Sequence, residues 1–113
     1  MGDVKHVTDQ DFEAEVIGSG TAVLVDFWAE WCVPCHMVSP VVEEIGRDKA
    51  GALSVVKLNI DENPEVTRRY SVMSIPTLIV FKDGEEKARV VGARPKEAIL
   101  REIDPHIAAE ATT

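Results

Sequence analysis

Two long runs of apolar, mostly β-branched residues set the strongest limit on how this chain can fold. They span 21–28 and 53–60, and polar residues interrupt each run at only a few positions. Runs of this composition are typical of strands buried on both faces of a sheet. The order of the segments predicts two parallel strands joined by a right-handed helical crossover. The crossover, 34–49, has apolar residues at helical spacing, namely Met37, Val38, Val41, Val42 and Ile45.

The remaining segments complete an α/β pattern around these strands. Thr8 and Asn63 have side chains suited to N-caps, and Pro64 suits a first helical turn. Asp83-Gly84 predicts a two-residue hairpin turn. The order predicts a mixed central sheet of five strands flanked by four helices. The predicted strands are 4–7, 21–28, 53–60, 77–82 and 87–91, and the predicted helices are 9–17, 34–49, 64–70 and 95–103.

Length and charge limit the possible classes of function. The chain has 113 residues, which suits one domain over 1–113, and we expect a monomer. Twenty acidic and twelve basic residues give a net charge of −8, which disfavours binding to nucleic acid or to an anionic membrane surface. No apolar run approaches the ~20 residues that span a bilayer, and the start lacks a secretory signal. We therefore expect a cytoplasmic protein.

The only two cysteines form the motif Cys32-Val33-Pro34-Cys35, directly after the first buried strand. Functional sites in such sheets form at the carboxyl ends of strands. At the start of the following helix, free N–H groups and the helix dipole stabilise a thiolate at Cys32. Cys35 lies one helical turn further along the same face, close enough for a bridge. The spacing predicts a dithiol that forms and breaks a disulfide reversibly.

Structural interpretations compete with this redox one. Half of a zinc site would need two more ligands, and the candidates His6, His36 and His106 are widely separated in the sequence. A pair of inert core cysteines is disfavoured because the residues around them suggest an exposed rim. A structural staple is a poor explanation, since a bridge across so short a loop constrains little of the unfolded chain.

Several separated blocks resemble the thioredoxin family, in order and along nearly the whole chain. They are Trp28-Ala29-Glu30-Trp31-Cys32-Val33-Pro34-Cys35, Pro40, Lys57-Leu58-Asn59-Ile60-Asp61, Ile75-Pro76-Thr77 and Val91-Gly92-Ala93. The resemblance implies the thioredoxin fold and a protein-disulfide reductase. It also implies that a flavin-containing, NADPH-dependent thioredoxin reductase recharges the dithiol. We expect that no metal or tightly bound cofactor is needed.

The predicted cycle gives the two thiols different roles. Cys32 as thiolate attacks a substrate disulfide, and Cys35 then resolves the mixed disulfide. Asp26 interrupts the buried strand, where desolvation is expected to raise the pKa of its carboxyl group. Asp26 is predicted to accept the proton of Cys35, a role that the family resemblance favours, with Lys57 lowering the Asp26 pKa from the adjacent strand. The alternative is a buried ion pair of Asp26 and Lys57 that serves packing or register.

The resemblance also implies a substrate-binding surface beside the dithiol. It implies a cis peptide bond between Ile75 and Pro76, whose backbone pairs with an extended substrate segment. An ordinary trans proline at the start of a strand is the alternative. Trp31 is a predicted contact, whereas core packing explains Trp28 equally well. The other predicted contacts are Val33, Pro34 and Gly92.

Three positions depart from the usual thioredoxin pattern. Val33 and Ser74 stand where glycine is usual, and His36 stands where lysine is usual. Val33 adds a β-branched side chain at the rim, and His36 replaces a permanent charge by one that titrates around neutral pH. These changes bear on redox potential and on partner choice. A thiol oxidant or isomerase, and a binding module with an incidental dithiol, remain as competing functions.

Overall fold

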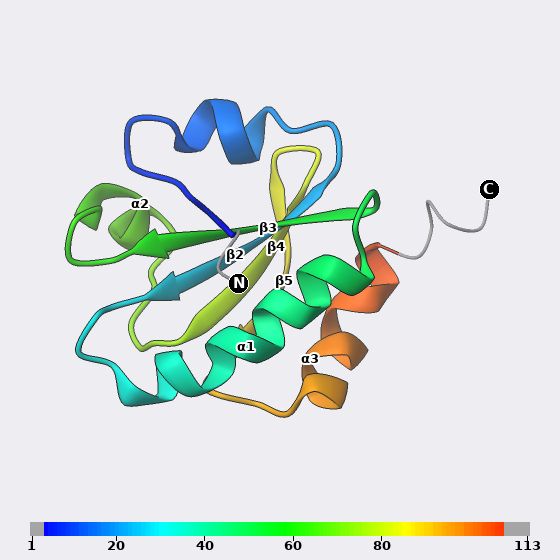
Figure 1. The fold of residues 1–113 in the computed structure, drawn as a ribbon. Coiled ribbons are helices and arrows are strands. Elements are labelled where there is room, and N and C mark those ends of the chain that lie inside the picture. Colours follow the sequence, from blue (N-terminus) through cyan, green and yellow to red (C-terminus); the bar gives the residue numbers. More distant parts are fainter. Residues whose placement is uncertain (1–3, 108–113) are drawn as a thin grey trace.

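Five strands form one mixed sheet with helices on both faces (Figure 1). The computed structural model describes residues 4–107. The elements are β1 (Lys5–His6), the π-helical η1 (Glu13–Ile17), β2 (Ala22–Trp28), α1 (Val33–Asp48), β3 (Leu53–Asn59), α2 (Pro64–Arg69), β4 (Thr77–Lys82), β5 (Glu85–Val91), α3 (Lys96–Ile103) and the 3₁₀-helical η2 (Asp104–His106). The strand order is β1-β3-β2-β4-β5. Strands β1, β3 and β2 are parallel, β4 is antiparallel to β2, and β5 is antiparallel to β4. The predicted five-stranded mixed sheet is confirmed.

The strand β2 is the centre of this sheet. It pairs with β3 over seven residues and with β4 over five. The side chains from Ala22 to Phe27 are at most 1% exposed. The continuous apolar run therefore marks a strand that is buried on both faces, as predicted.

Alternate side chains of the sheet enter two separate apolar clusters. On one face, Leu24 of β2 packs in a cluster with Val42 of α1 and Ile99 of α3. On the other face, Val25 packs in a cluster with Val66 of α2 and with η1. Figure 1 shows α1 and α3 together on the first of these faces. The period-two alternation of β2 thus assigns each helix to one side of the sheet.

The first helical segment differs from its prediction. The pattern predicts a helix over 9–17, but turns come first and η1 is a short π-helix, in which the Gly18 N–H donates to the Glu13 carbonyl at 2.8 Å. The Thr8 N–H donates to Asp11 Oδ1 at 2.7 Å, and the Asp11 N–H donates to Thr8 Oγ1 at 3.3 Å. These reciprocal bonds form a capping box, so the Thr8 side chain caps the segment as predicted. The prediction of one regular helix over 9–17 is wrong, because turns precede η1 and its backbone bond reaches the fifth preceding residue.

Helix α2 begins where predicted, but Asn63 does not cap it. Asp9 Oδ2 accepts the Glu65 N–H at 3.1 Å, and Asp9 Oδ1 accepts the Val66 N–H at 2.9 Å. The Asn63 side chain has other partners, since its Oδ1 accepts the Asp9 N–H and its Nδ2 donates to the Asn59 carbonyl. A distant carboxylate therefore takes the place of the local cap and joins the segment after β1 to α2.

The hairpin turn forms at Asp83-Gly84 as predicted. The two residues have φ angles of 55° and 79°, and a type I′ turn requires positive φ at both central positions. Strand β5 begins at Glu85 and not at Lys87, because so short a turn lets Lys82 pair directly with Glu85.

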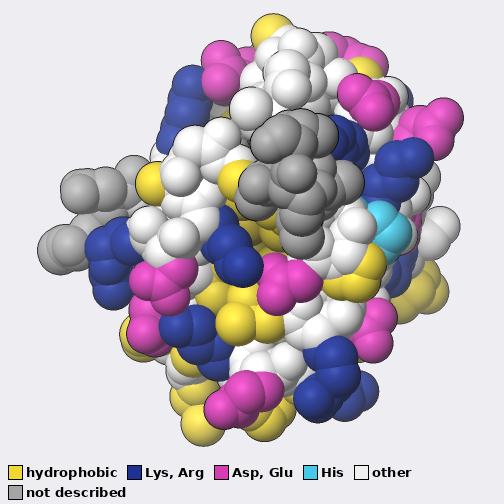
Figure 2. All heavy atoms as spheres, turned by 90° about the vertical axis from the view of Figure 1, so that its right-hand side faces the viewer, with side chains coloured by type: hydrophobic (Ala, Val, Ile, Leu, Met, Phe, Trp, Pro, Cys, Tyr) yellow, Lys and Arg dark blue, Asp and Glu magenta, His cyan; other side chains and the backbone are white. Residues whose placement is uncertain are grey.

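Charged side chains of both signs cover the end of the molecule where α1 ends. Figure 2 shows this face, with acidic and basic side chains interleaved around small apolar areas. Lys96 of α3 pairs with Glu44 and Asp48 of α1 at 3.0 and 2.8 Å, and Lys49 pairs with Asp104 at 2.9 Å. Within residues 4–107, no helix is long and apolar enough to cross a membrane.

We expect the Asp9 carboxylate to contribute about 0.5–2 kcal/mol to the free energy of unfolding, the usual range for a helix cap. Asp9→Ala removes the acceptors of the Glu65 and Val66 N–H groups. Urea unfolding measures this loss. The control Glu62→Ala removes an exposed acid just before α2 and should change stability by less than about 0.5 kcal/mol. Equal effects of the two substitutions would contradict the capping role.

Candidate active site

Cys32 and Cys35 lie where β2 leads into α1. Cys32 is the N-cap residue, with extended φ and ψ of −92° and 103°, and Cys35 lies in the first turn. Their sulfur atoms are bonded to each other, and their Cα atoms are 5.3 Å apart. The Cys35 N–H donates to Cys32 Sγ at 3.2 Å, so an N–H group that has no partner within the helix points at this sulfur. The predicted bridge at a helix start is present.

Asp26 is completely buried in β2. Among residues 4–107, neither of its carboxylate oxygens has a hydrogen-bond partner. Because side chains alternate along a strand, Asp26 shares with Leu24 the face of the sheet that α1 covers. Burial raises the pKa of the Asp26 carboxyl group from 3.8 to about 7, and the charge of Lys57 opposes part of that rise. The group therefore titrates near neutral pH.

Lys57 is the cross-strand neighbour of Asp26, as the parallel register requires. Its ammonium group binds elsewhere, because Nζ donates to Ser39 Oγ of α1 at 3.0 Å and lies 4.6 Å from the centre of the Trp28 ring. Lys57 thus acts on the Asp26 carboxyl group through its charge, without a hydrogen bond. Within residues 4–107, no hydrogen bond joins Lys57 to Asp26, so the alternative of a buried ion pair that serves packing or register depends on charge alone.

The predicted substrate-binding loop lies beside the dithiol. The Ile75–Pro76 peptide bond is cis, as the resemblance implies, and the alternative of a trans proline is wrong. The Pro76 carbonyl accepts the Gly92 N–H at 2.8 Å. Ile75 packs against the cluster that contains Cys32 and Cys35. Three segments that are distant in the sequence therefore meet around the disulfide.

Comparison with known proteins agrees with this geometry. The family model "Thioredoxin" matches residues 3–105. The chain belongs to the thioredoxin family. It is 56% identical over 97 residues to the thioredoxin of Mycobacterium tuberculosis, which covers 86% of this chain and 84% of that protein. It is 54% identical over 104 residues to the thioredoxin of Staphylococcus epidermidis (92% and 98% covered) and 49% identical over 107 residues to thioredoxin 1 of Nostoc sp. (95% and 100% covered).

As a member of the thioredoxin family, the protein is a thiol-disulfide oxidoreductase with the redox pair Cys32–Cys35. It acts on protein disulfides, and thioredoxin reductase is its partner for recharging. The described residues contain no group of three or more His, Cys, Asp or Glu side chains arranged to hold a metal ion. The zinc interpretation therefore has no ligand set in residues 4–107.

Large apolar side chains are exposed around the thioredoxin dithiol. Trp31 and Val33 are 66% and 67% exposed, and Pro34 between Val33 and Cys35 is also exposed. The Trp31 Nε1 donates to an oxygen of Asp61 at 2.8 Å, which fixes the indole at the rim.

Three further large apolar side chains are exposed, namely Met37, Met73 and Val91. The apolar spacing over 34–49 includes Met37, but this side chain is 68% exposed, whereas Val38, Val42 and Ile45 are buried. For Met73 and Val91, the sequence signal is a position within two residues of a predicted contact.

Trp28 lies beside two histidines that are far apart in the sequence. The His6 and His36 rings each lie 6.0 Å from the Trp28 ring. His36 Nε2 donates to the Glu30 carbonyl at 2.8 Å. His36, which stands where thioredoxins usually have lysine, therefore links the first turn of α1 by a hydrogen bond to the loop that precedes Cys32.

Asp26→Asn is predicted to stabilise the oxidised protein at pH 8 and to leave it unchanged at pH 4. Folding raises the pKa of Asp26 from 3.8 to about 7, so the native state holds this proton more tightly than the unfolded chain does. The contribution of this proton to the free energy of unfolding is fully present below about pH 4 and is lost as the pH rises through about 7. Above that pH, the buried charge costs up to ~4 kcal/mol.

Guanidinium unfolding at the two pH values measures this difference. Glu97→Gln, which changes an exposed carboxyl group, serves as the matched control and should have nearly the same small effect at both pH values. A gain from Asp26→Asn of equal size at pH 4 and pH 8 would show that the carboxylate charge is not its cause.

Proposed function

We propose that this protein reduces protein disulfides by a two-step exchange in which Cys32 attacks and Cys35 resolves. The Cys32 thiolate attacks one sulfur of the substrate disulfide and releases the other as a thiolate, leaving a mixed disulfide. The deprotonated Cys35 then attacks Cys32 Sγ, releases the second substrate thiolate and closes the Cys32–Cys35 bridge. Two electrons pass from the dithiol to the substrate. The exchange itself needs no metal or bound cofactor.

The observation that carries this assignment is the position of Cys32 at the N-cap of a 16-residue helix. The Cys35 N–H donates to Cys32 Sγ, and the positive end of the helix dipole faces the same sulfur. Both effects favour negative charge at Cys32 over Cys35. Cys32 is therefore the better attacking thiolate, and in the resolving step its sulfur is attacked by Cys35 while the substrate thiolate leaves.

Asp26 is the proposed proton acceptor for Cys35. A pKa of about 7 leaves a large fraction of the carboxyl group ionised at neutral pH and still basic enough to take a proton. Its place on the α1 face of β2 supports this role. Lys57 is the proposed regulator of Asp26, since its charge limits the rise in the Asp26 pKa.

The proposed substrate surface surrounds the disulfide. An extended substrate segment pairs with the backbone at Ile75, in the manner of strand addition. The cis bond before Pro76 and the packing of Ile75 on the cysteine cluster support this placement. The other proposed contacts are Trp31, Val33, Pro34 and Gly92.

The same proposal includes a monomer of one thioredoxin domain over 1–113, located in the cytoplasm. The match of the family model to residues 3–105 and the single five-stranded sheet support one domain. The net charge of −8 supports a protein that binds neither nucleic acid nor anionic membranes. Size-exclusion chromatography with light scattering measures the oligomeric state.

Cysteine variants test the reductase function and the two thiol roles. The wild type should reduce insulin disulfides in the presence of dithiothreitol, and the double variant Cys32→Ser, Cys35→Ser should not accelerate the reaction. In a separate reaction without dithiothreitol, pre-reduced Cys35→Ser should accumulate a mixed disulfide with insulin through Cys32, visible on a non-reducing gel, because the protein has no second thiol to resolve it. Cys32→Ser should accumulate none. Equal trapping by both single variants would contradict the roles, and insulin reduction by the double variant would contradict a dithiol mechanism.

Asp26→Asn should slow the resolving step by roughly 10² at pH 7.5, the size of effect expected for a general base. In the wild type, the rate of resolution should rise with pH through about 7, because the ionised carboxylate is the active form. The variant should lose this inflection. Stopped-flow release of the second insulin thiol measures the rate, and an unchanged pH profile in the variant would exclude Asp26 as the proton acceptor.

A further inference from the structure

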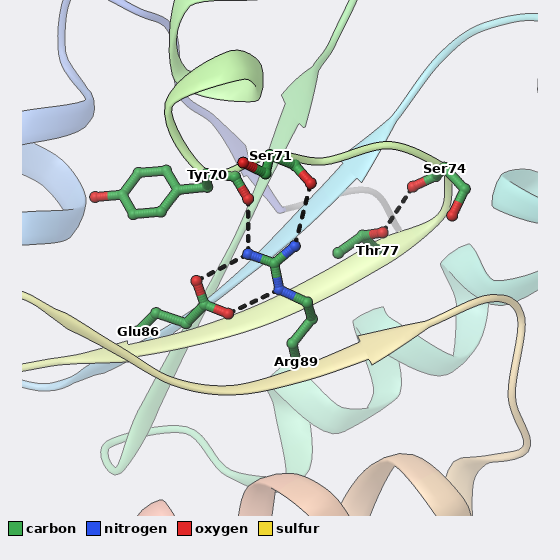
Figure 3. Close-up of polar contacts among 6 residues, drawn as sticks. All are labelled: Tyr70, Ser71, Ser74, Thr77, Glu86 and Arg89. Carbon is green, nitrogen blue, oxygen red and sulfur yellow. Dashed lines mark hydrogen bonds and ion pairs between the residues drawn. The ribbon is translucent and has the colours of Figure 1, made fainter.

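Arg89 of β5 binds the end of helix α2 through its guanidinium group. Figure 3 shows the arrangement, in which Nη2 donates to the Tyr70 carbonyl at 2.7 Å and Nη1 donates to the Ser71 carbonyl at 3.5 Å. Glu86 holds the same guanidinium from β5, because its two oxygens accept from Nε at 2.7 Å and from Nη2 at 2.9 Å. Because Glu86 binds one edge of the planar guanidinium, the neighbouring edge is oriented to bind carbonyl oxygens.

The two carbonyls belong to the turn that ends α2. The Ser71 N–H donates to the Arg68 carbonyl at 3.0 Å, and the Val72 N–H donates to the Thr67 carbonyl at 3.0 Å. This pair of bonds is the Schellman arrangement of a helix end. Ser71 occupies its left-handed position with a φ of 54°, where glycine is the favoured residue. The turn therefore lacks the glycine that would adopt this φ most readily. Arg89 binds the carbonyl oxygens of Tyr70 and Ser71 in this turn.

The turn begins the loop that runs to the proposed substrate edge. Ser71 is four residues before Ile75, and the far end of the loop is held by Thr77 Oγ1, which donates to the Ser74 carbonyl at 2.7 Å (Figure 3). Between these two anchors, Met73 is 90% exposed. The path of this short loop is thus determined by hydrogen bonds at its ends.

We infer that Arg89 is a positioning residue for protein substrates: it holds the Tyr70–Ser71 turn so that the loop 71–75 presents the Ile75 backbone to an extended peptide beside the dithiol. Arg89 does not touch the sulfur atoms, and its effect is confined to substrates that dock on the loop. The inference rests on the proposed function, because it requires pairing of a substrate segment with Ile75. A small disulfide that reaches Cys32 without docking on the loop does not depend on Arg89.

A surface ion pair that only stabilises the fold is the competing explanation. Lys96 offers a matched comparison, since its side chain is 29% exposed, as is that of Arg89, and it pairs with two acids at the far end of α1. Loss of either side chain removes a surface charge and its ion pairs with neighbouring acids. Only the loss of Arg89 should change how a protein substrate docks.

The test uses pre-reduced protein mixed with increasing concentrations of insulin, or with the small disulfide 5,5′-dithiobis(2-nitrobenzoate). Insulin oxidation of the protein is followed by tryptophan fluorescence, which yields a half-saturating concentration and a limiting rate. Arg89→Ala should raise the half-saturating insulin concentration by about fivefold, the factor expected when a docking loop must be ordered on binding. Its limiting rate and its rate with the small disulfide should stay within about twofold of the wild type.

Two further variants distinguish positioning from charge. Arg89→Lys keeps the charge and loses the planar fork, so its half-saturating concentration should resemble that of Arg89→Ala. Adding Ser71→Gly to Arg89→Ala should recover part of the insulin affinity, because glycine adopts the left-handed turn without the bound carbonyls. Lys96→Ala should bind insulin as the wild type does.

The inference is overturned if Arg89→Ala has the half-saturating insulin concentration of the wild type. It is equally overturned if insulin and the small disulfide lose rate in parallel, or if Lys96→Ala matches Arg89→Ala in insulin affinity. Failure of the wild type to react with insulin would refute the proposed function itself. Failure of the Arg89 inference alone would leave the wild-type reaction intact, so the two results are distinguishable.

Discussion

Pairing of β2 with β3 in parallel and with β4 in antiparallel is the interaction on which the other elements depend. For β3 to run parallel beside β2, the chain must return to the end of the sheet where β2 begins, and α1 makes that return. The start of α1 must therefore lie at the carboxyl end of β2. Cys32 and Cys35 occupy this junction, so the geometry that closes the sheet also places the thiols at a helix N-terminus.

The same strand contains the main conflict between stability and activity. Asp26 lies where an apolar residue would be most favourable, with no hydrogen-bond partner in residues 4–107 and with a pKa raised to about 7. Burial causes both the stability cost and the raised pKa of Asp26. The stability cost therefore cannot be removed without also losing the pKa near 7. Lys57 moderates the effect from the next strand, while its ammonium group binds Ser39 and lies over the Trp28 ring.

Local residue patterns were sufficient for the strands, the crossover, the hairpin and the disulfide pair. Each of these follows from the pattern of neighbouring residues: a continuous apolar run in a strand, apolar spacing in a helix, the positive φ that Asp83-Gly84 adopts, and a cysteine spacing of one helical turn. The chemistry of Cys32 at a helix start and of Asp26 in an apolar run could likewise be predicted, because both depend mainly on burial and on the nearest backbone groups.

Partners far apart in the sequence were decided only by the tertiary structure. Asn63 has the side chain of a cap, yet the fold brings Asp9 to the start of α2 and turns Asn63 to other partners. Nothing local indicates that Arg89 binds the end of α2 or that Lys57 donates to Ser39. A hydrogen bond needs its two atoms within about 3 Å and in line, and only the packing of whole elements determines which side chains reach that distance. The sequence thus specifies the elements and the reactive groups, and the packing of the sheet selects the contacts that position them.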